Sequence, residues 1–263
     1  MTNVLKRNNV TIIGEGENVM LFAHGFGCDQ NSWKYIRNNF ASAYKLVLFD
    51  YVGAGNSDLT LYDPKKYNSL DGYVTDLLEI CDALALKDII FIGHSVSCMI
   101  GSLAAIKRPA IFKKLIFIGP SPCYINKGIY KGGFDQETID SLLELLEEDY
   151  ISWARSFAPA IMNKENDPLL GKELTDSFCS IDPDIAKQFA RVTFLSDNRT
   201  DLSRIPVPSL TIQCSNDIIA PLTVGQYINE HTPGNTLIVL EANGHCPHMS
   251  YPAETTAAIN AYL

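Results

Sequence analysis

One serine of the chain stands in a sequence pattern that suits nucleophilic catalysis. The segment Gly93-His94-Ser95-Val96-Ser97 follows the apolar run 89–92 and opens a helix-like segment, 96–107. A strand, a sharp turn and a helix in this order hold the serine of a G-x-S-x-G motif out as a nucleophile. Ser97 stands in place of the last glycine, but it is small enough for the helix to pass close to the strand. Ser95 is therefore the candidate nucleophile, and the alternative is a serine that only caps the helix.

A serine hydroxyl becomes a nucleophile when a base takes its proton and a carboxylate orients that base. His245 is the candidate base among five histidines, because it lies just past the strand-like run 237–240. Asp217 is the candidate carboxylate, because it lies just past the run 210–213. Taken singly, the histidine could be structural and the aspartate a loop cap. Together with Ser95 they stand at strand ends, where parallel sheets form active sites, in the Ser-Asp-His order of α/β-hydrolases.

The oxyanion that forms during acyl transfer needs two backbone N–H donors that are in place beforehand. One is expected from Val96, the residue after the nucleophile. The loop Ala23-His24-Gly25-Phe26-Gly27 follows an early strand-like run, and its glycines give it the freedom to aim the Phe26 N–H. The sequence thus predicts an oxyanion hole formed by Phe26 and Val96, with a plain strand-to-helix turn as the alternative.

The sequence gives no support to a cofactor or metal site. The segment Gly53-Ala54-Gly55 does not extend to G-x-G-x-x-G, because Asp58 takes the last position, and no P-loop is present. The segment His245-Cys246-Pro247-His248 has no second group of ligands at a spacing suited to zinc. We therefore expect neither a cofactor nor a metal ion.

Strand-like and helix-like segments alternate around these residues. Between two of the strand-like runs, residues 70–84 carry apolar side chains at helical spacing. Strands separated by helices imply crossover connections and a mostly parallel sheet with helices on both faces, which is an α/β fold. The strand-like runs are 10–13, 19–23, 46–49, 89–92, 115–118, 210–213 and 237–240, and a last helix is expected over 252–263.

The strand pattern is interrupted after the fifth run. Asp167-Pro168 and Asp182-Pro183 each place a capping residue before a proline, as at helix starts, and four short helices fit the interruption. We expect one domain, with an α/β-hydrolase core formed by 1–120 and 201–263 and a helical lid formed by 121–200. The lid should close a narrow apolar cavity suited to a small hydrophobic ester or lactone. The residues expected to line this cavity are Phe26, Tyr124, Phe134, Leu142, Trp153, Phe157 and Phe194.

The composition limits the partners and the compartment. The chain has 263 residues, of which 46% are apolar and 19% charged, and no apolar run is long enough to span a membrane. Thirty acidic and twenty-one basic residues give a net charge of −9, which argues against nucleic acid and anionic lipid as partners. Seven cysteines without a Cys-x-x-Cys pair indicate buried, reduced thiols. Because no secretory signal is visible, we expect a cytoplasmic protein.

Five blocks of the sequence resemble those of a known group of hydrolases. They are similar to the RsbQ-like α/β-hydrolases of the bacterial stress response and, less closely, to the plant karrikin and strigolactone receptor hydrolases. The similarity runs over nearly the whole chain and includes the expected lid. The blocks are His24–Gln30, Phe49–Gly55, Gly93–Ser97, Gly119–Tyr124 and Gly244–Ser250.

The resemblance implies an α/β-hydrolase core, a V-shaped four-helix lid and a triad of Ser95, Asp217 and His245. It also implies a signalling role. RsbQ-like proteins act with a PAS-domain phosphatase of the RsbP type in activating the sigma-B response, and the plant relatives perceive butenolide-type ligands. RsbQ itself has proline in place of His24 and glycine in place of Ser97, and at both positions this chain is like the plant receptors.

Two functions follow as expectations. The first is a serine hydrolase that acts on a small hydrophobic ester, lactone or butenolide-like compound through an acyl-enzyme. The alternative is a ligand sensor whose lid binds a protein partner, with slow or dispensable hydrolysis. Seven acidic residues between Gly133 and Tyr150 would then face a basic partner surface, unless they are only a solvated helix face. Dehalogenation or epoxide opening on this fold uses an aspartate nucleophile, which Ser95 disfavours.

Overall fold

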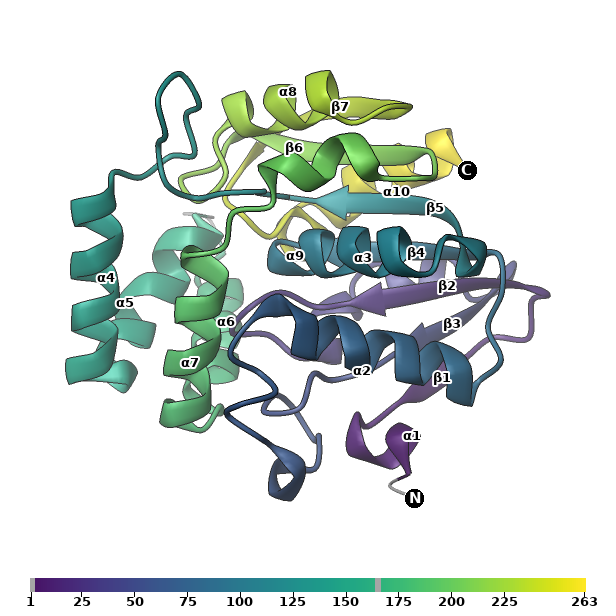
Figure 1. Cartoon of the computed structure of the whole chain (residues 1–263), viewed down its shortest axis with the longest axis horizontal. Coiled ribbons are helices and arrows are strands. Elements are labelled where there is room, and N and C mark those ends of the chain that lie inside the picture. The colour runs from purple at the N-terminus through teal and green to yellow at the C-terminus, as the bar shows by residue number, and fades with distance from the viewer. Residues whose placement is uncertain (1–2, 164–166) are drawn as a thin grey trace.

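A seven-stranded sheet forms the centre of the molecule (Figure 1). The computed structural model describes residues 3–163 and 167–263. Positions 1–2 of the expected core and 164–166 of the expected lid lie outside the described residues. The strands lie in the order β1-β3-β2-β4-β5-β6-β7, and every neighbouring pair is parallel except β1 and β3. Their bounds are β1 Thr11–Ile13, β2 Asn18–Ala23, β3 Tyr44–Leu48, β4 Ile89–His94, β5 Phe112–Ile118, β6 Ser209–Asn216 and β7 Asn235–Asn243.

Every strand-like run of the sequence is a strand, so the predicted α/β fold is confirmed. Strand β4 is buried along its whole length, because both faces of the sheet are covered. Alternate side chains of β2 enter two separate hydrophobic cores: Leu21 packs on one face, and Met20 and Phe22 pack on the other. The sheet therefore has two apolar faces, as a mostly parallel sheet requires.

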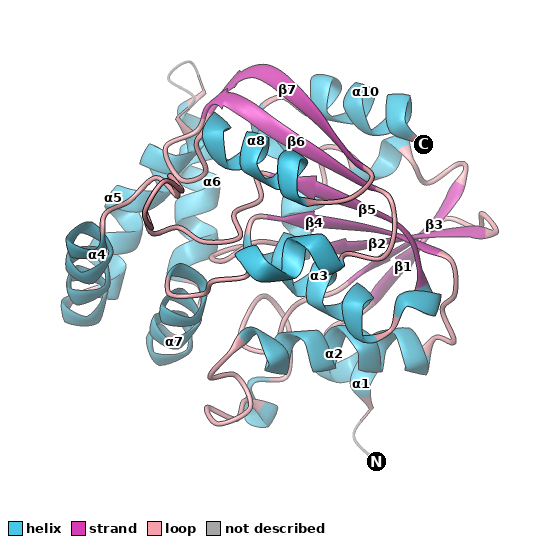
Figure 2. Ribbon diagram, turned by 45° about the horizontal axis from the view of Figure 1, so that its top comes forward, coloured by secondary structure: helices cyan, strands magenta, loops and turns pink. Residues whose placement is uncertain are grey.

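Helices cover both of these faces (Figure 2). The cluster that contains Leu21 includes side chains of α2 (Leu70–Ala83), α3 (Val96–Lys107) and α8 (Leu222–His231). The cluster that contains Met20 includes side chains of α10 (Pro252–Tyr262). Among the described residues, no helix is both long enough and apolar enough to cross a membrane. The remaining helices of the core are short: α1 Val4–Arg7 and α9 Pro247–Ser250.

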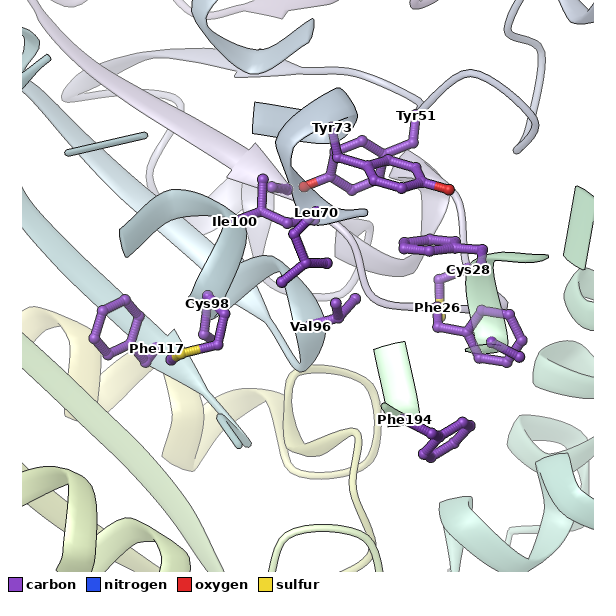
Figure 3. Packing of buried hydrophobic residues seen from close by; sticks show 14 of the residues in the cluster. Phe26, Cys28, Tyr51, Leu70, Tyr73, Val96, Cys98, Ile100, Phe117 and Phe194 are labelled. Carbon is purple, nitrogen blue, oxygen red and sulfur yellow. The ribbon is translucent and has the colours of Figure 1, made fainter. Parts of the chain in front are cut away.

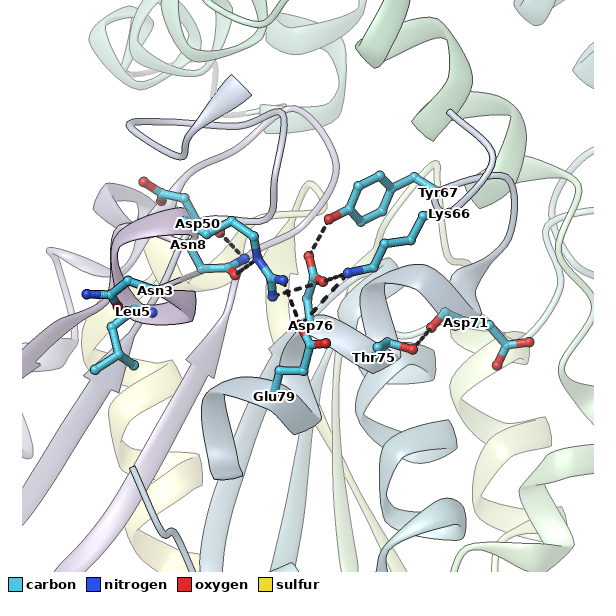
Figure 4. A network of polar contacts seen from close by, with 11 residues as sticks. Asn3, Leu5, Asn8, Asp50, Lys66, Tyr67, Asp71, Thr75, Asp76 and Glu79 are labelled. Atoms are coloured by element: carbon cyan, nitrogen blue, oxygen red, sulfur yellow. Dashed lines mark hydrogen bonds and ion pairs between the residues drawn. The ribbon is translucent and has the colours of Figure 1, made fainter. Parts of the chain in front are cut away.

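A buried ion-pair network fastens α1 to α2 (Figure 4). The fully buried Asp76 carboxylate lies 3.0 Å from Arg7 Nη2 and accepts a hydrogen bond from Tyr67 OH at 2.7 Å. Lys66 pairs with the same carboxylate, and Arg7 Nη1 lies 2.7 Å from Glu79. Two cations and a phenol thus compensate the charge of Asp76, without which its burial would be costly. The network fixes α1 and the loop before α2 against α2.

Four helices lie between β5 and β6 in the chain and gather beyond the carboxyl ends of the strands, at the left in Figure 1. Two of them begin at the predicted prolines, Pro168 and Pro183. Asp182 caps the second by accepting hydrogen bonds from the backbone amides of Asp184 and Ile185. We call these four helices the lid: α4 Gln136–Glu148, α5 Tyr150–Met162, α6 Pro168–Cys179 and α7 Pro183–Phe194.

Candidate active site

Ser95 lies at a sharp turn between β4 and α3. Its backbone has φ 57° and ψ −124°, a conformation that costs energy for a residue with a side chain. The turn brings α3 close to β4, since a Cβ added to Gly93 would lie 2.9 Å from the carbonyl carbon of Ser97. Glycine is therefore required at position 93. This strained turn at the end of β4 is the strand-to-helix elbow that displays a nucleophile.

Three side chains form one hydrogen-bonded chain at this point. His245 Nε2 lies 2.8 Å from Ser95 Oγ, and His245 Nδ1 lies 2.7 Å from Asp217 Oδ2. Because a carboxylate only accepts, Nδ1 carries the proton and Nε2 is left to accept the proton of the serine hydroxyl. Ser95 is 7% exposed, Asp217 6% and His245 4%, so bulk water does not compete for these bonds. The structure brings together the three residues that the sequence singled out as a triad.

The backbone of His245 is held by two other elements. Its N–H donates to the Ile161 carbonyl at 2.8 Å, in the last turn of α5. Its carbonyl accepts a hydrogen bond from His94 Nε2 at 2.9 Å. Burial, and then the neighbouring His248 and His245, hold the pKa of His94 well below its usual range, so His94 is a neutral donor. The candidate base is therefore positioned jointly by the elbow and by the lid.

The loop after β2 runs directly beside the nucleophile. A Cβ added to Gly25 would lie 3.3 Å from Ser95 Cβ and 2.5 Å from His94 Nδ1, so the loop can pass here only as glycine. Within the part of the chain that the structure describes, neither the Phe26 amide nor the Val96 amide donates a hydrogen bond. Both amides are thus free to donate to an oxyanion, as the predicted oxyanion hole requires.

A small cavity adjoins Ser95. Its volume is about 20 Å³, which is room for roughly one water molecule. Most of its lining is apolar, and Phe26 and Phe194 belong to the buried cluster that also contains Val96 and Tyr51 (Figure 3). The lining residues are Phe26, Cys28, His94, Ser95, Tyr124, Phe157, Ile161, Leu174, Phe178, Thr193, Phe194, Ile219, His245 and Cys246.

Three residues expected in this lining lie elsewhere. Trp153 stacks on Phe157 with ring centroids 4.4 Å apart, so it forms a second layer behind the wall. Phe134 is held in the loop before α4, where its N–H donates to the Tyr124 carbonyl. Leu142 is on α4, a helix that contributes no lining residue. The expectation for Trp153, Phe134 and Leu142 is corrected accordingly, because apolar residues of the lid also pack its helices together.

Several lining residues of the lid were not predicted from the sequence. Leu174 and Phe178 are one helical turn apart on α6 and face the cavity together. The Phe178 ring packs edge-on against Phe26 at 5.4 Å and lies over Gly27, where a Cβ would come within 2.1 Å of it. The i, i+4 spacing of Leu174 and Phe178 was a readable signal of one apolar stripe on α6. Ile161 carries the same signal on α5 with Phe157.

Among the described residues, three polar side chains besides the triad members line the cavity, His94, Tyr124 and Thr193, and the Tyr124 hydroxyl is within hydrogen-bond distance of the nucleophile. Tyr124 OH lies 3.4 Å from Ser95 Oγ, and the side chain is 1% exposed. Burial raises the pKa of Tyr124 well above its usual value, so the phenol keeps its proton. A neutral phenol can donate a hydrogen bond to a substrate oxygen beside the nucleophile.

A larger surface hollow does not coincide with this chemistry. It has a volume of about 490 Å³ and is lined by residues such as Asn68, Arg191 and Asp201, with no member of the triad. His248, the second histidine of the 245–248 segment, packs against Trp33 with ring centroids 4.5 Å apart. In the described residues, no three His, Cys, Asp or Glu side chains are grouped so that they could hold a metal ion.

Comparison with known proteins agrees with this geometry. Residues 20–259 match the model of the Alpha/beta hydrolase family. The chain belongs to this family. It shares 38% identity over 253 residues with strigolactone esterase D14 of Arabidopsis thaliana, covering 96% of this chain and 94% of that relative. It shares 38% identity over 264 residues with karrikin insensitive 2 receptor IA of Petunia hybrida, covering 100% and 96%.

A solved structure of similar sequence also belongs to a hydrolase. The structure of a hydrolase from Oleispira antarctica matches with a TM-score of 0.96 and 41% identity, covering 99% of this chain and 96% of that one. An esterase from Exiguobacterium antarcticum has 23% identity and a TM-score of 0.89, which supports the fold alone. From its family and its relatives, the protein is an Alpha/beta hydrolase of the esterase type.

Proposed function

We propose that the protein is a serine esterase in which Ser95, His245 and Asp217 carry out acyl transfer to water. The observation that carries this proposal is the continuous chain from Ser95 Oγ through His245 to Asp217, with links of 2.8 and 2.7 Å, beside a mostly apolar cavity. In such an environment each charge–dipole interaction is stronger than it would be in water.

The reaction proceeds in two balanced halves. Ser95 Oγ bonds to the acyl carbon while its proton passes to His245 Nε2, and the amides of Phe26 and Val96 receive the oxyanion. The oxyanion then collapses, the bond to the leaving alcohol breaks, and His245 protonates that alcohol. A water molecule next gives a proton to His245 while its oxygen bonds to the acyl carbon. The bond between that carbon and Ser95 Oγ then breaks, and His245 returns the proton to Oγ as the acid is released. Asp217 holds the imidazole and stabilises its cationic form throughout.

The substrate class follows from the walls of the cavity. Most of the described wall consists of phenylalanine and aliphatic side chains, which give a charged substrate no ionic partner, and the hydroxyls of Tyr124 and Thr193 can each form a hydrogen bond. A small hydrophobic ester, lactone or butenolide-like compound fits these walls. With a volume of about 20 Å³, the cavity must widen to admit it, which residues 121–200 allow if they act as a lid over the core of 1–120 and 201–263.

Labelling with a fluorophosphonate tests the nucleophile. The reagent bonds covalently to an activated serine, and the intact mass should rise by one adduct in the parent protein and in Ser102→Ala. Ser102 is a buried serine of the same helix whose hydroxyl donates to the Cys98 carbonyl. Ser95→Ala should take up no label, and its turnover of p-nitrophenyl acetate should fall at least about 10³-fold. Labelling of Ser95→Ala at the parental rate would refute the assignment.

A ligand-sensing role is the second candidate. Two observations favour it: relatives at 38% identity include a protein named as a karrikin insensitive 2 receptor, and the lid is bonded directly to His245. On this proposal, ligand in the cavity changes the lid, and a protein such as a PAS-domain phosphatase of the RsbP type binds there in a stress or signalling response in the cytoplasm. The acidic face of α4 would meet basic groups on that partner.

The sensor proposal is tested by binding together with turnover. A candidate phosphatase should bind the protein more tightly when a butenolide is present, and Glu144→Lys with Glu148→Lys on α4 should weaken that binding. Ligand-independent binding, or binding that survives both substitutions, would count against the lid as the docking face. Fast turnover of many esters without ligand-dependent binding would leave esterase activity as the whole function.

A further inference from the structure

Ser97 is the middle member of a second hydrogen-bonded chain, which runs from Tyr51 through Ser97 to His24. It lies in the first turn of α3, two residues after the nucleophile, and its side chain is fully buried. Its hydroxyl donates to the His24 carbonyl. Since that proton is committed to a carbonyl that can only accept, the Tyr51 hydroxyl, 2.8 Å from Ser97 Oγ, must be the donor in the second bond. Burial raises the pKa of Tyr51 far above its usual value, so the phenol keeps this proton.

The same two residues also fix the side chain of His24. The Tyr51 backbone N–H donates to His24 Nε2 at 3.2 Å, which leaves the proton on Nδ1, and Nδ1 lies 2.9 Å from the Gly25 carbonyl. The rings of His24 and Tyr51 meet edge to face at 5.0 Å. His24 is therefore held at its carbonyl by Ser97 and at its ring by Tyr51.

The order of the strands explains why Tyr51 and Ser97 contact the loop after β2 from opposite sides. His24 follows β2, Tyr51 follows β3 and Ser97 follows β4, and β2 lies between β3 and β4 in the sheet. The Phe26 amide, one of the two free amides beside Ser95, is only two residues beyond His24. Ser97 itself does not line the cavity, so it can influence catalysis only through the residues that it holds.

We propose that Ser97 is a positioning residue that sets the Phe26 N–H for the oxyanion by fixing His24 between α3 and Tyr51. The proposal rests on the proposed function, because it assumes attack by Ser95. A glycine at position 97 would leave the His24 carbonyl and the Tyr51 hydroxyl buried without this partner. Loss of the Ser97 hydroxyl should loosen the loop, so the transition state should lose stabilisation while the bound ester does not.

The test compares Ser97→Ala with Ser102→Ala, which removes an equally buried hydroxyl from the same helix. With p-nitrophenyl acetate, kcat of Ser97→Ala should fall about 10- to 30-fold with KM within about twofold, since complete loss of an oxyanion donor costs 10²- to 10³-fold. The inhibition constant of an alkyl trifluoromethyl ketone should rise by the same factor. Ser95 adds to that ketone and forms a hemiketal whose oxyanion lies where the oxyanion of the ester reaction would lie, at the Phe26 and Val96 amides. Ser102→Ala should change neither constant, although both variants lose a buried hydrogen bond.

Three results separate the possible failures. If Ser97→Ala equals Ser102→Ala in kcat and in ketone affinity, the positioning role is wrong while the esterase proposal stands. If Ser95→Ala keeps the parental turnover, the proposed function itself is wrong, and the positioning role falls with it. If Ser97→Ala does not unfold cooperatively, Tyr51→Phe decides instead, because it removes the bond to Ser97 Oγ. It should lower kcat about threefold or more with KM unchanged, and an unchanged kcat would overturn the proposal.

Discussion

Asp217 binds His245 with one carboxylate oxygen and its own loop with the other. Oδ2 lies 2.7 Å from His245 Nδ1, and Oδ1 accepts the backbone amides of Ile219 and Ala220 at 2.8 and 3.2 Å. The carboxylate therefore cannot rotate without losing two backbone bonds. The direction in which His245 points is fixed by the chain just after β6, not by the histidine loop alone.

Asp217→Asn should keep the fold and remove most of the activity. The amide can donate to His245 Nδ1 in place of accepting from it, which favours the tautomer whose Nε2 cannot take the Ser95 proton. We expect kcat to fall about 10³- to 10⁴-fold. The measurement is ester hydrolysis, with circular dichroism to check the fold. The control is Asp201→Asn, the same change in the 3-10 helix Arg199–Arg204, where Asp201 bonds to Asn198 and Arg204, and it should retain parental turnover.

Phe157→Ala should widen the range of esters that the protein accepts. Phe157 lines the cavity but is only half-buried, so its truncation opens the wall toward solvent at a modest cost in stability. The ratio of kcat/KM for p-nitrophenyl hexanoate over acetate should rise about tenfold, which corresponds to roughly 1.4 kcal/mol of new apolar contact. Phe134→Ala is the matched control, because Phe134 is equally half-buried and does not line the cavity. An equal rise in both variants would contradict the assignment of the wall.

His248→Phe should make the protein less sensitive to acid. Burial lowers the pKa of His248 to about 3, below the ordinary histidine value of 6.5. Between these two pH values the unfolded chain binds a proton that the folded chain does not, so the free energy of unfolding falls as the pH falls from about 6.5 to about 3. One such group lowers the free energy of unfolding by up to about 1.4 kcal/mol for each pH unit between these two values.

The measurement is urea unfolding at several pH values between 7 and 4.5. Phenylalanine keeps the ring packing against Trp33 and removes two ring nitrogens that have no hydrogen-bond partner among the described residues. The free energy of unfolding at pH 7 should therefore be unchanged or higher. Its slope against pH should be smaller, by an amount that corresponds to at most one proton taken up on unfolding. The exposed His231→Phe is the control. A slope that stays the same after His248→Phe would contradict the prediction.

Cysteine labelling should be slow in the folded protein. Six of the seven cysteines are buried, and burial raises the pKa of Cys28, Cys81 and Cys214 to about 12, so almost no thiolate is present at pH 8. Ellman's reagent should react with about one thiol in the native state, the half-buried Cys179, and with seven in guanidinium chloride. Cys179→Ser should abolish the native reaction. Fast reaction of two or more thiols in that variant would show that the buried segments open.

The strands and the triad were readable because both are local in the sequence. Each strand is a short apolar run, and Ser95 and Asp217 come within a few residues of a strand end. Strand limits differ by up to three residues, since a backbone ladder continues through polar residues such as Thr236 of β7, which is paired with Leu210 of β6.

The cavity wall was harder to predict, because it depends on how the helices of the lid are turned. Trp153 and Phe157 are on the same stripe of α5, yet only Phe157 reaches the cavity. The orientation of a helix is set by its neighbours, and the apolar spacing does not distinguish packing between helices from lining of a cavity. The network of Ser97, Tyr51 and His24 was likewise hidden, because its three members come from strands that become neighbours only in the folded sheet.

The hydrogen bond from the His245 amide to the Ile161 carbonyl makes the lid a part of the catalytic apparatus and not only a cover. Heat that frays the last turn of α5 would release the candidate base at the same moment as it opens the cavity. Thermal inactivation should then begin before the sheet melts, at the temperature where α5 alone gives way. For the same reason, an engineered version without the lid would gain access to Ser95 and lose the support of its own histidine.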